Sequence, residues 1–312
     1  MKRTVLCILV TALMGGLVLP AAAAGRGEKE ADSTAPVLGL SVSTLNNMFF
    51  VTLRDGAQEA ARELGVQLLV VDSQDDPTRE ASNIQDLLQR GVSALLINPT
   101  DSDAIAPSVH RANQSGVPVF TIDRGAHGGT VVSHIASDNV AGGSLAAEYL
   151  LQKIGGTGEI AELQGIPGTS AARDRGAGFN SVVSGSAHVR LVAAQTANFN
   201  RTEGLDVFQN ILQAQTNLKG VFAHNDEMIL GAIQAAEAAG RARDMIFVGF
   251  DAVEDALTAV ADGKLHATVA QKPAEMGRLG VITALNYLAG KPVESSIPVD
   301  LQLVTAENVD HF

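Results

Sequence analysis

From residue 37 onward, short runs of Val, Ile and Leu alternate with segments whose apolar residues recur at helical spacing. The runs are VLGLSVS, VQLLVVDS, ALLINPT, VPVFTIDR, GEIAELQG, VRLVAAQ, GVFAHND and MIFVGFD, with ATVAQ as a shorter late member. Because these runs are apolar throughout, they predict strands buried on both faces, as in a parallel sheet. Strands of this kind with helices between them predict a doubly wound α/β fold.

The intervening segments carry the start and stop signals of helices. In DDPTREASNIQDLLQRG, Asp76 can cap the helix, Pro77 suits its first position, and Gly91 ends it. Further along, the run VVSHIASDN leads directly into the helical segment VAGGSLAAEYLLQKIGG, without a Pro-rich or Gly/Ser-rich linker. A domain boundary of this kind indicates a hinge made of strands.

About ten strands exceed the usual size of one sheet, so we expect two similar lobes. One lobe should comprise residues 37–137 and 272–300, and the other residues 138–271 and 301–312. The chain should cross between the lobes near Ser137, Gln271 and Asp300.

The first 24 residues have the composition of a secretory signal peptide. Lys2 and Arg3 precede an apolar stretch, which is followed by Pro20 and a run of small residues suited to cleavage near Ala23 or Ala24. The alternative is a membrane anchor, but the apolar stretch is short and no charged stop-transfer flank follows it. Residues 25–36 are small and charged and predict a flexible leader.

Removal of the signal changes the charge and the redox chemistry of the chain. The only cysteine, Cys7, is lost, and 20 basic residues remain against 34 acidic ones, a net charge of −14. Such a chain forms no disulfide, and its charge argues against nucleic acid and anionic membrane surfaces as partners. The charge does not argue against a small neutral ligand.

Polar side chains stand where the predicted strands end. In open α/β sheets, ligands bind beyond the carboxyl ends of the strands. The amide, carboxylate and guanidinium groups found there suit sugar hydroxyls, because each hydroxyl both donates and accepts a hydrogen bond. These residues are Asn47, Asn98, Asp123 with Arg124, Gln164, Asn225, Asp251 and Gln271.

Several of these residues also have a structural interpretation. Asp251 can cap a following helix with Glu254 at the capping-box position, and Asn225 can start a helix. Asn98 precedes Pro99 and can shape a turn. Gln164 can do the same.

Arg173, Asp174 and Arg175 stand together at the expected start of a helix, where a salt-bridged surface turn is the alternative to a binding role. Asp123 is harder to explain structurally, because the RGAHGG that follows it is not helical.

Catalytic and metal-binding motifs are missing from the sequence. It holds no nucleophile elbow, phosphate loop or H-E-x-x-H pattern, and its seven histidines are scattered without metal-ligand spacing. We therefore expect neither an enzyme nor a bound cofactor or metal.

Several stretches are nearly identical to those of a known family. They are STLNN with FF, DGAQEA, LLINPTDSDA, VVSHIASDN, ELQGIPGTSAARDRG, FAHNDEM, VGFD and DGKLHATVAQ. Through them the chain resembles the bacterial periplasmic D-ribose-binding proteins, soluble receptors of ABC sugar importers, from about residue 37 to 304. The resemblance implies a type I periplasmic binding protein fold and a location in the periplasm.

The resemblance also implies a set of ligand residues. From the first lobe, Asn47, Asp123 and Arg124 would bind hydroxyls, and Phe49 and Phe50 would wall one side of the sugar. Asn98 and, with less support, Arg173 would support the site. The second lobe would contribute four hydrogen-bonding groups and an opposite aromatic wall: Arg175, Asn225, Asp251, Gln271 and Phe199.

Three positions depart from the family pattern: Met48 replaces a proline, His224 a glutamine, and Ala252 a glycine. They leave the ligand groups in place. Two aspartates against two arginines form a balanced set, which suits a neutral sugar better than a phosphorylated one.

The expected function is therefore capture of D-ribose, or a closely related pentose, by a monomeric periplasmic receptor. Its partners would be an ABC permease and, in addition, a chemoreceptor. Another monosaccharide or a furanose-like signal molecule is the nearest alternative. A repressor effector domain would need an N-terminal helix-turn-helix where the signal peptide stands, and a sugar-modifying enzyme would need catalytic groups that the sequence lacks.

Overall fold

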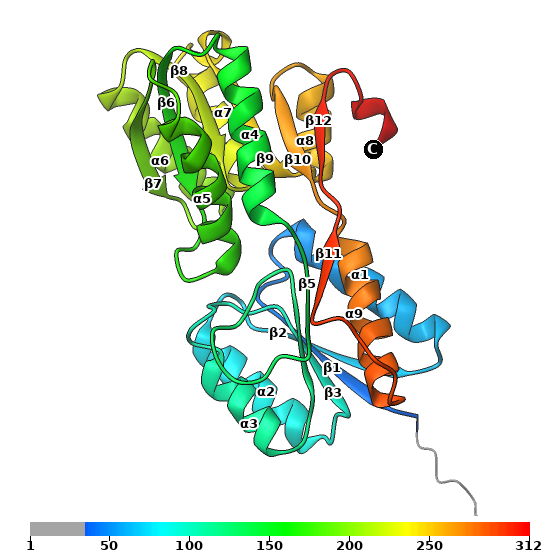
Figure 1. Ribbon diagram of the computed structural model, residues 1–312. Coiled ribbons are helices and arrows are strands. Elements are labelled where there is room, and N and C mark those ends of the chain that lie inside the picture. Colours follow the sequence, from blue (N-terminus) through cyan, green and yellow to red (C-terminus); the bar gives the residue numbers. More distant parts are fainter. Residues whose placement is uncertain (1–34) are drawn as a thin grey trace, which may run out of the picture. The chain divides into compact units, whose positions relative to one another are not determined.

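The computed structural model describes residues 35–312, which form two α/β lobes with a six-stranded sheet in each (Figure 1). The expected signal peptide lies outside the described residues, as does the leader up to residue 34. Both lobes have helices on the two faces of their sheet, as the alternation of apolar runs and helical segments predicts.

The sheet of the first lobe is parallel throughout, with the strand order β11-β5-β4-β3-β1-β2. Its central strand β3 is completely buried, which is why the sequence there is apolar on both faces. The strands are β1 (Val37–Val42), β2 (Gln67–Asp72), β3 (Ala94–Ile97), β4 (Val119–Ile122), β5 (Ser133–Ser137) and β11 (Ser296–Val299).

Four helices cover this sheet, α1 (Met48–Glu63) and α9 (Pro273–Leu288) on one face and α2 (Pro77–Gln89) and α3 (Ala106–Gln114) on the other. Helices α1 and α9 pack closely, because a Cβ at Gly277 would overlap the Leu53 carbonyl oxygen. The expected cap of α2 is confirmed: the Asp76 side chain accepts from Thr78 N, and Pro77 is the first helical residue.

The sheet of the second lobe has the order β12-β10-β9-β8-β6-β7, in which only β12 is antiparallel within residues 35–312. Its strands are β6 (Gly158–Gln164), β7 (Val189–Thr196), β8 (Leu218–Ala223), β9 (Ile246–Asp251), β10 (Ala267–Ala270) and β12 (Gln302–Thr305).

Helices α4 and α5 pack on one face of this second sheet, and α6 and α7 pack together on the other. The helices of this lobe are α4 (Asn139–Lys153), α5 (Ser170–Ser184), α6 (Arg201–Ala214), α7 (Asp226–Ala238) and α8 (Glu254–Ala261), with short 3₁₀ turns η1 (Ala242–Asp244) and η2 (Val309–His311).

The chain passes between the sheets three times: after β5, after β10, and between β11 and β12 (Figure 1). These crossings fall at the expected positions near Ser137, Gln271 and Asp300. The lobes are therefore joined by several chain segments, and the multi-strand hinge is confirmed. The exact residue boundaries of the two lobes stay a prediction.

Each apolar run of the sequence contains a strand, but β11 and β12 were not expected. Both are four residues long and lie at sheet edges, and most of their residues are partly or fully exposed. They therefore lack the continuous apolar run by which the other strands are recognised.

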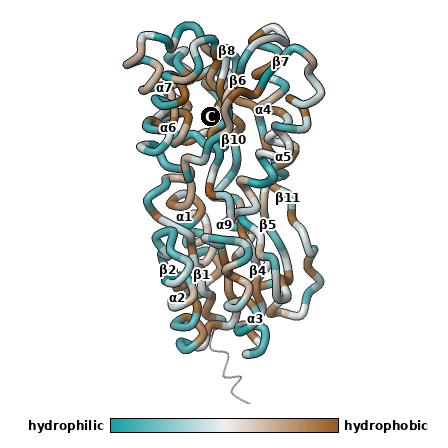
Figure 2. The backbone as a smooth tube through the Cα atoms, turned by 90° about the vertical axis from the view of Figure 1, so that its left-hand side faces the viewer, coloured by the Kyte–Doolittle hydropathy of each residue, from teal (hydrophilic) through white to brown (hydrophobic). Residues whose placement is uncertain are grey.

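Hydrophobic residues gather along the inner strands of both lobes, as Figure 2 shows. Separate buried clusters lie on either side of each sheet. Among the helices of residues 35–312, none combines the length and hydropathy that a membrane span requires.

Candidate functional site

A small cavity lies where the carboxyl ends of strands from both sheets face one another. Its volume is about 20 Å³, far below the roughly 300–1,000 Å³ of sites for drug-sized ligands. The structure brings together nine of the ten residues expected to touch a ligand, and adds Ala171, which the sequence did not indicate. The lining residues are Asn47, Phe49, Phe50, Asp123, Arg124, Ala171, Arg175, Phe199, Asn225 and Asp251.

The start of helix α1 positions the aromatic wall of the first lobe. Asn47 caps this helix, and its side-chain oxygen accepts from Phe49 N at 2.9 Å. Phe49 and Phe50 are buried and meet edge to face, with 5.1 Å between the ring centroids. Met48, between cap and rings, is 59% exposed and does not line the cavity.

The loop after β4 supplies Asp123 and Arg124, both 3% exposed. Asn98, expected to support the site, donates from Nδ2 to Asp123 Oδ2 at 3.1 Å and to the Ile122 carbonyl at 3.1 Å. Arg124 donates to the Pro99 carbonyl at 3.2 Å. Asn98 thus holds the aspartate in place and does not line the cavity itself.

The Arg124 guanidinium lies near an aromatic ring from each lobe. Its central carbon is 5.0 Å from the centroid of the Phe50 ring and 5.4 Å from that of Phe199. Cation–π attraction at such distances contributes about 0.5–2 kcal/mol, more where water is excluded. The arginine therefore helps to hold the two lobes against one another.

Arg175 dominates the second lobe's part of the site. It donates to Asn139 Oδ1 at 2.8 Å and to the His224 carbonyl at 2.6 Å, and lies 3.4 Å from Asp251 Oδ1. Gln271 donates to the same Asp251 oxygen at 2.8 Å. Arg175 is 3% exposed, so the alternative of a salt-bridged surface turn is wrong for it.

Of the two residues that could cap a helix, only Asn225 does so. Asn225 does cap α7, because its side-chain oxygen accepts from Met228 N at 3.0 Å, and it lines the cavity as well. Asp251 is not a helix cap: it is the last residue of β9, and Val253 precedes the first residue of α8.

Burial perturbs the charged groups of the site. It raises the pKa of Asp251 to about 7, although Arg175 and the Gln271 hydrogen bond oppose the shift. Burial also lowers the pKa of Arg124, with Asp123 acting in the opposite direction. Two carboxyl groups and two guanidinium groups therefore share a poorly hydrated space in which an additional net charge would be costly.

Unsatisfied polar atoms concentrate here. Within residues 35–312, six buried side-chain atoms lack a hydrogen-bond partner, and half of them belong to two cavity-lining residues and to Gln271, which bonds the cavity-lining Asp251. They are Asp123 Oδ1, Arg124 Nε and Gln271 Oε1. Such atoms cost about 1–3 kcal/mol each when left unpaired, and a ligand carrying both donors and acceptors would satisfy them.

Backbone strain concentrates at the same place. Asp123, Phe199 and Asp251 have φ angles of +63°, +59° and +117° although none is glycine. Residues held in such conformations cost about 1–3 kcal/mol and cluster at functional sites. This strain marks the cavity independently of its composition.

Four residues considered from the sequence do not line the cavity: Asn98, Gln271, Arg173 and Gln164. Arg173 donates to the Gly168 carbonyl at 3.2 Å, and its Nη2 lies 2.9 Å from His127 Nε2 on the other lobe. Gln164 donates to Glu162 at 3.1 Å.

Direct hydrogen bonds join the lobes beside the cavity. Ser102 N donates to the Gly168 carbonyl at 2.9 Å, Ser170 N donates to Ser102 Oγ at 3.1 Å, and Gly125 N donates to Ser170 Oγ at 2.9 Å. No sequence pattern indicated these contacts. They show the lobes in a closed arrangement.

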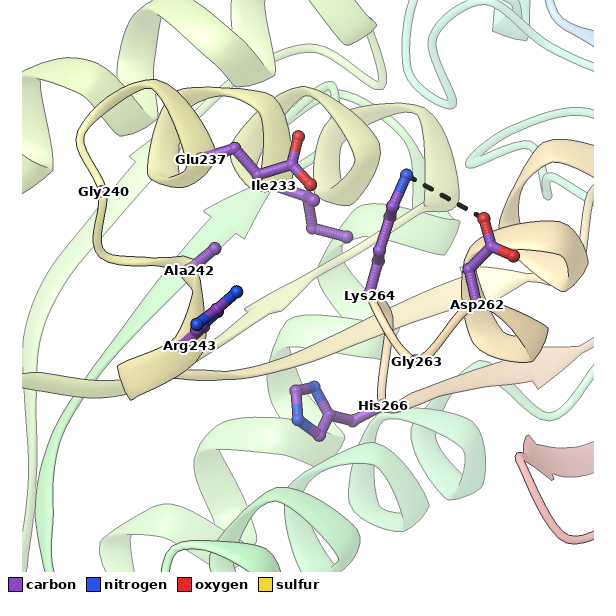
Figure 3. Close-up of a pocket in the computed structure, with 9 residues that line it drawn as sticks. All are labelled: Ile233, Glu237, Gly240, Ala242, Arg243, Asp262, Gly263, Lys264 and His266. Carbon is purple, nitrogen blue, oxygen red and sulfur yellow. Dashed lines mark ion pairs between the residues drawn. The ribbon is translucent and has the colours of Figure 1, made fainter.

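A broader depression lies at the amino ends of strands of the second lobe, before the first residues of β9 and β10 (Figure 3). Its side chains carry mixed charges, with Lys264 and Asp262 paired at 3.9 Å. In the described part of the chain, the acidic, histidine and cysteine side chains form no group suited to a metal ion. The cavity between the lobes, which gathers unpaired buried atoms and strained backbone, is the candidate site.

Comparison with known proteins agrees with this geometry. The chain is 52% identical over 271 residues to the ribose import binding protein of Escherichia coli, covering 86% of this chain and 90% of that protein. It is 48% identical over 297 residues to the ribose import binding protein of Haemophilus influenzae, covering 95% and 99%.

A related fold is found in solved structures. A solute-binding protein of an ABC transporter from Bacillus halodurans, with bound myo-inositol, superimposes with a TM-score of 0.86 at 31% identity, covering 90% of this chain and 98% of that one. A solute-binding protein of an ABC transporter from Actinobacillus succinogenes, with bound D-allose, gives a TM-score of 0.84 at 29% identity, covering 89% of this chain and 100% of that one. Residues 38–292 match the periplasmic binding protein domain. With its two parallel-sheet lobes and a closed cavity between them, the chain belongs to the periplasmic binding protein family.

Proposed function

We propose that the protein is an exported receptor that binds D-ribose between its lobes and delivers it to an ABC-type permease. The observation that carries this proposal is the cavity's combination of balanced charge, aromatic walls and unpaired buried polar atoms. A small uncharged polyol has the hydroxyls to pair these atoms and adds no net charge.

The arrangement of groups supports a pyranose or furanose ring as the ligand. Phe49 and Phe50 stand on the first lobe and Phe199 on the second, so apolar C–H faces of a ring would be covered from two sides. Asp123 and Arg124 would bind hydroxyls from the first lobe, with Asn47 beside them. The second lobe would add Arg175, Asn225, Asp251 and Gln271.

Closure follows from this division of the ligand groups. Because both lobes contribute, sugar binds the closed arrangement more tightly than an open one and shifts the population toward it. The hinge would bend where the chain crosses between the sheets, near Ser137, Gln271 and Asp300. The closed protein would then be recognised by the permease and, as a further partner, by a chemoreceptor.

The same proposal covers export and assembly. The N-terminal sequence supports removal of residues 1–24, with cleavage near Ala23 or Ala24, and release of a monomer into the periplasm. The relatives named ribose import binding proteins support the choice of D-ribose. D-Allose and myo-inositol, bound to more distant relatives, are the competing ligands.

The test is calorimetric titration of the mature protein with D-ribose, L-arabinose, D-allose, D-galactose, myo-inositol and ribose 5-phosphate. D-Ribose should bind most tightly, and the phosphate ester should not bind, because its charge would be buried without a matching surplus of cations. Binding of another sugar in preference to ribose would refute the ligand, and binding of none would refute the receptor.

Two substitutions locate the binding. Asp123→Asn removes a charged acceptor and should weaken ribose binding at least about tenfold, because hydrogen bonds to charged groups contribute about 1.5–3 kcal/mol. Asp262→Asn, an equivalent change at the depression of Figure 3, should leave affinity unchanged. The reverse result would place the ligand site elsewhere.

A further inference from the structure

A buried pair of titratable side chains lies behind the cavity, in the second lobe. His224 is 1% exposed and Glu162 is fully buried, and His224 Nε2 lies 2.8 Å from Glu162 Oε1. Neither residue lines the cavity. The carboxylate also accepts from Gln164 at 3.1 Å and from Asn180 at 3.3 Å. A buried carboxylate requires several hydrogen-bond donors around it, because burial of an unpaired charge is costly.

The hydrogen bonds define the state of the imidazole. Gly165 N donates to His224 Nδ1 at 3.2 Å, so this nitrogen is an acceptor and the proton resides on Nε2, facing Glu162. Burial lowers the pKa of His224, an effect that Glu162 opposes and Arg175 reinforces. The charged groups that face the ring are thus Glu162 from β6 and Arg175 from α5. The ring is neutral, and both of its nitrogens are used.

This network ends on groups of the cavity. Gly165 lies directly against the Phe199 ring, since a Cβ at Gly165 would overlap it. The His224 carbonyl accepts from Arg175 at 2.6 Å, and Asn225 follows His224 in the chain. His224 therefore connects Glu162 to three cavity-lining residues through Gly165, through its own carbonyl and through its neighbour.

We propose that His224 is a positioning residue for the sugar site, which fixes the Gly165 segment behind Phe199 and the carbonyl that orients Arg175. This role rests on the proposed function. It predicts that changes at His224 alter sugar affinity although the side chain touches no ligand.

Two substitutions separate the parts of this role. His224→Phe keeps a ring of similar size but leaves Gly165 N and Glu162 without their partner, so D-ribose affinity should fall about tenfold or more. His224→Gln retains an amide donor and an acceptor, so its D-ribose affinity should fall less than about threefold near neutral pH. His266→Gln is the matched control: His266 Nδ1 also accepts from a backbone amide, Phe247 N at 3.2 Å, but it lies at the depression of Figure 3.

A pH profile distinguishes positioning from simple loss of stability. If His224 Nδ1 were protonated, its N–H would face the N–H of Gly165, and the hydrogen bond between them would be lost. Because burial lowers the pKa of His224 below the ordinary histidine value of 6.5, the affinity of the unsubstituted protein relative to His224→Gln should stay constant down to that pH and fall only at more acidic pH. Other titrating groups of the site are common to both proteins and cancel in this ratio.

The experiment is calorimetric titration of the three variants and the unsubstituted protein with D-ribose, from about pH 8 to about pH 5. A constant affinity ratio across this range, together with equal affinities at neutral pH, would overturn the positioning role while leaving the receptor function intact. If His224→Phe does not fold, the glutamine variant and its pH profile decide. If the unsubstituted protein binds none of the sugars, the proposed function fails and this role fails with it.

Discussion

The hydrogen bonds between the lobes predict that a residue without sugar contact controls affinity. Gly125 N donates to Ser170 Oγ at 2.9 Å, from the segment that follows Asp123 and Arg124 to the first residue of α5. Because the bond joins the two lobes, it would break if they separated. Ser170→Ala removes it and leaves the rest of α5 unchanged, including the Thr169 cap that accepts from Ala172 N.

The size of the effect follows from the geometry of this bond. Both partners are partly exposed in the closed form and would be hydrated in the open one, so the net loss is that of an ordinary hydrogen bond, about 0.5–1.5 kcal/mol. Apparent affinity scales with the population of the competent state, so D-ribose should bind about 2-fold to 13-fold more weakly. The loss should appear as faster dissociation, because the bond forms after the sugar has entered.

Stopped-flow dissociation and calorimetry of Ser170→Ala measure both quantities. Ser184→Ala is the matched control, because its hydroxyl donates to Ser181 O at 3.1 Å on the exposed end of the same helix. Small-angle scattering of the sugar-free protein shows whether the variant also shifts the free population toward an open form. An unchanged affinity combined with an unchanged scattering radius would refute the contribution of these bonds to closure.

Three further changes test local features of the structure. Ala252 has a φ of +58°, so Ala252→Gly should raise the free energy of unfolding by about 1 kcal/mol in denaturant titrations, and a loss of stability would contradict the strain. Met48 is the first residue of α1 and is exposed, so Met48→Pro should raise stability by up to about 1 kcal/mol, and a shortened α1 or a loss of stability would show that proline does not fit there. Burial raises the pKa of Glu80 from 4.5 to about 7 despite its Thr100 hydrogen bonds. The protonated Glu80 therefore contributes stability that is present below pH 4.5 and is lost as the pH rises through 7. Over this range the free energy of unfolding of Glu80→Gln should rise by up to about 3 kcal/mol relative to that of the unsubstituted protein. Parallel stability curves for the two proteins would exclude the shift.

The sequence predicted much of the fold because a buried parallel strand must be apolar on both faces. It also located most of the cavity, because the carboxyl ends of parallel strands meet at one edge. Asp123 and Asp251 were found in this way, each at the end of an apolar run. The roles assigned to them and to their neighbours in ligand binding stay predictions.

The contacts that the sequence did not indicate join residues far apart in the chain and have no local pattern. Ser102 and Ser170 are ordinary loop and helix-start residues until the lobes bring them together. Glu162 lies on β6 and His224 directly follows β8, so only the pairing of these two strands places one beside the other. The sequence did not predict the edge strands β11 and β12, because their partly exposed residues do not form a continuous apolar run.

A crystal structure of the mature protein grown with D-ribose would show where and how the sugar binds. One ribose should lie in the cavity between the lobes, with hydroxyl oxygens within about 3 Å of Asp123 Oδ1, Arg124 Nε and Gln271 Oε1. The ring should lie between the Phe50 and Phe199 side chains. Ribose bound elsewhere, or bound in the cavity with those three atoms still unpaired, would contradict this prediction.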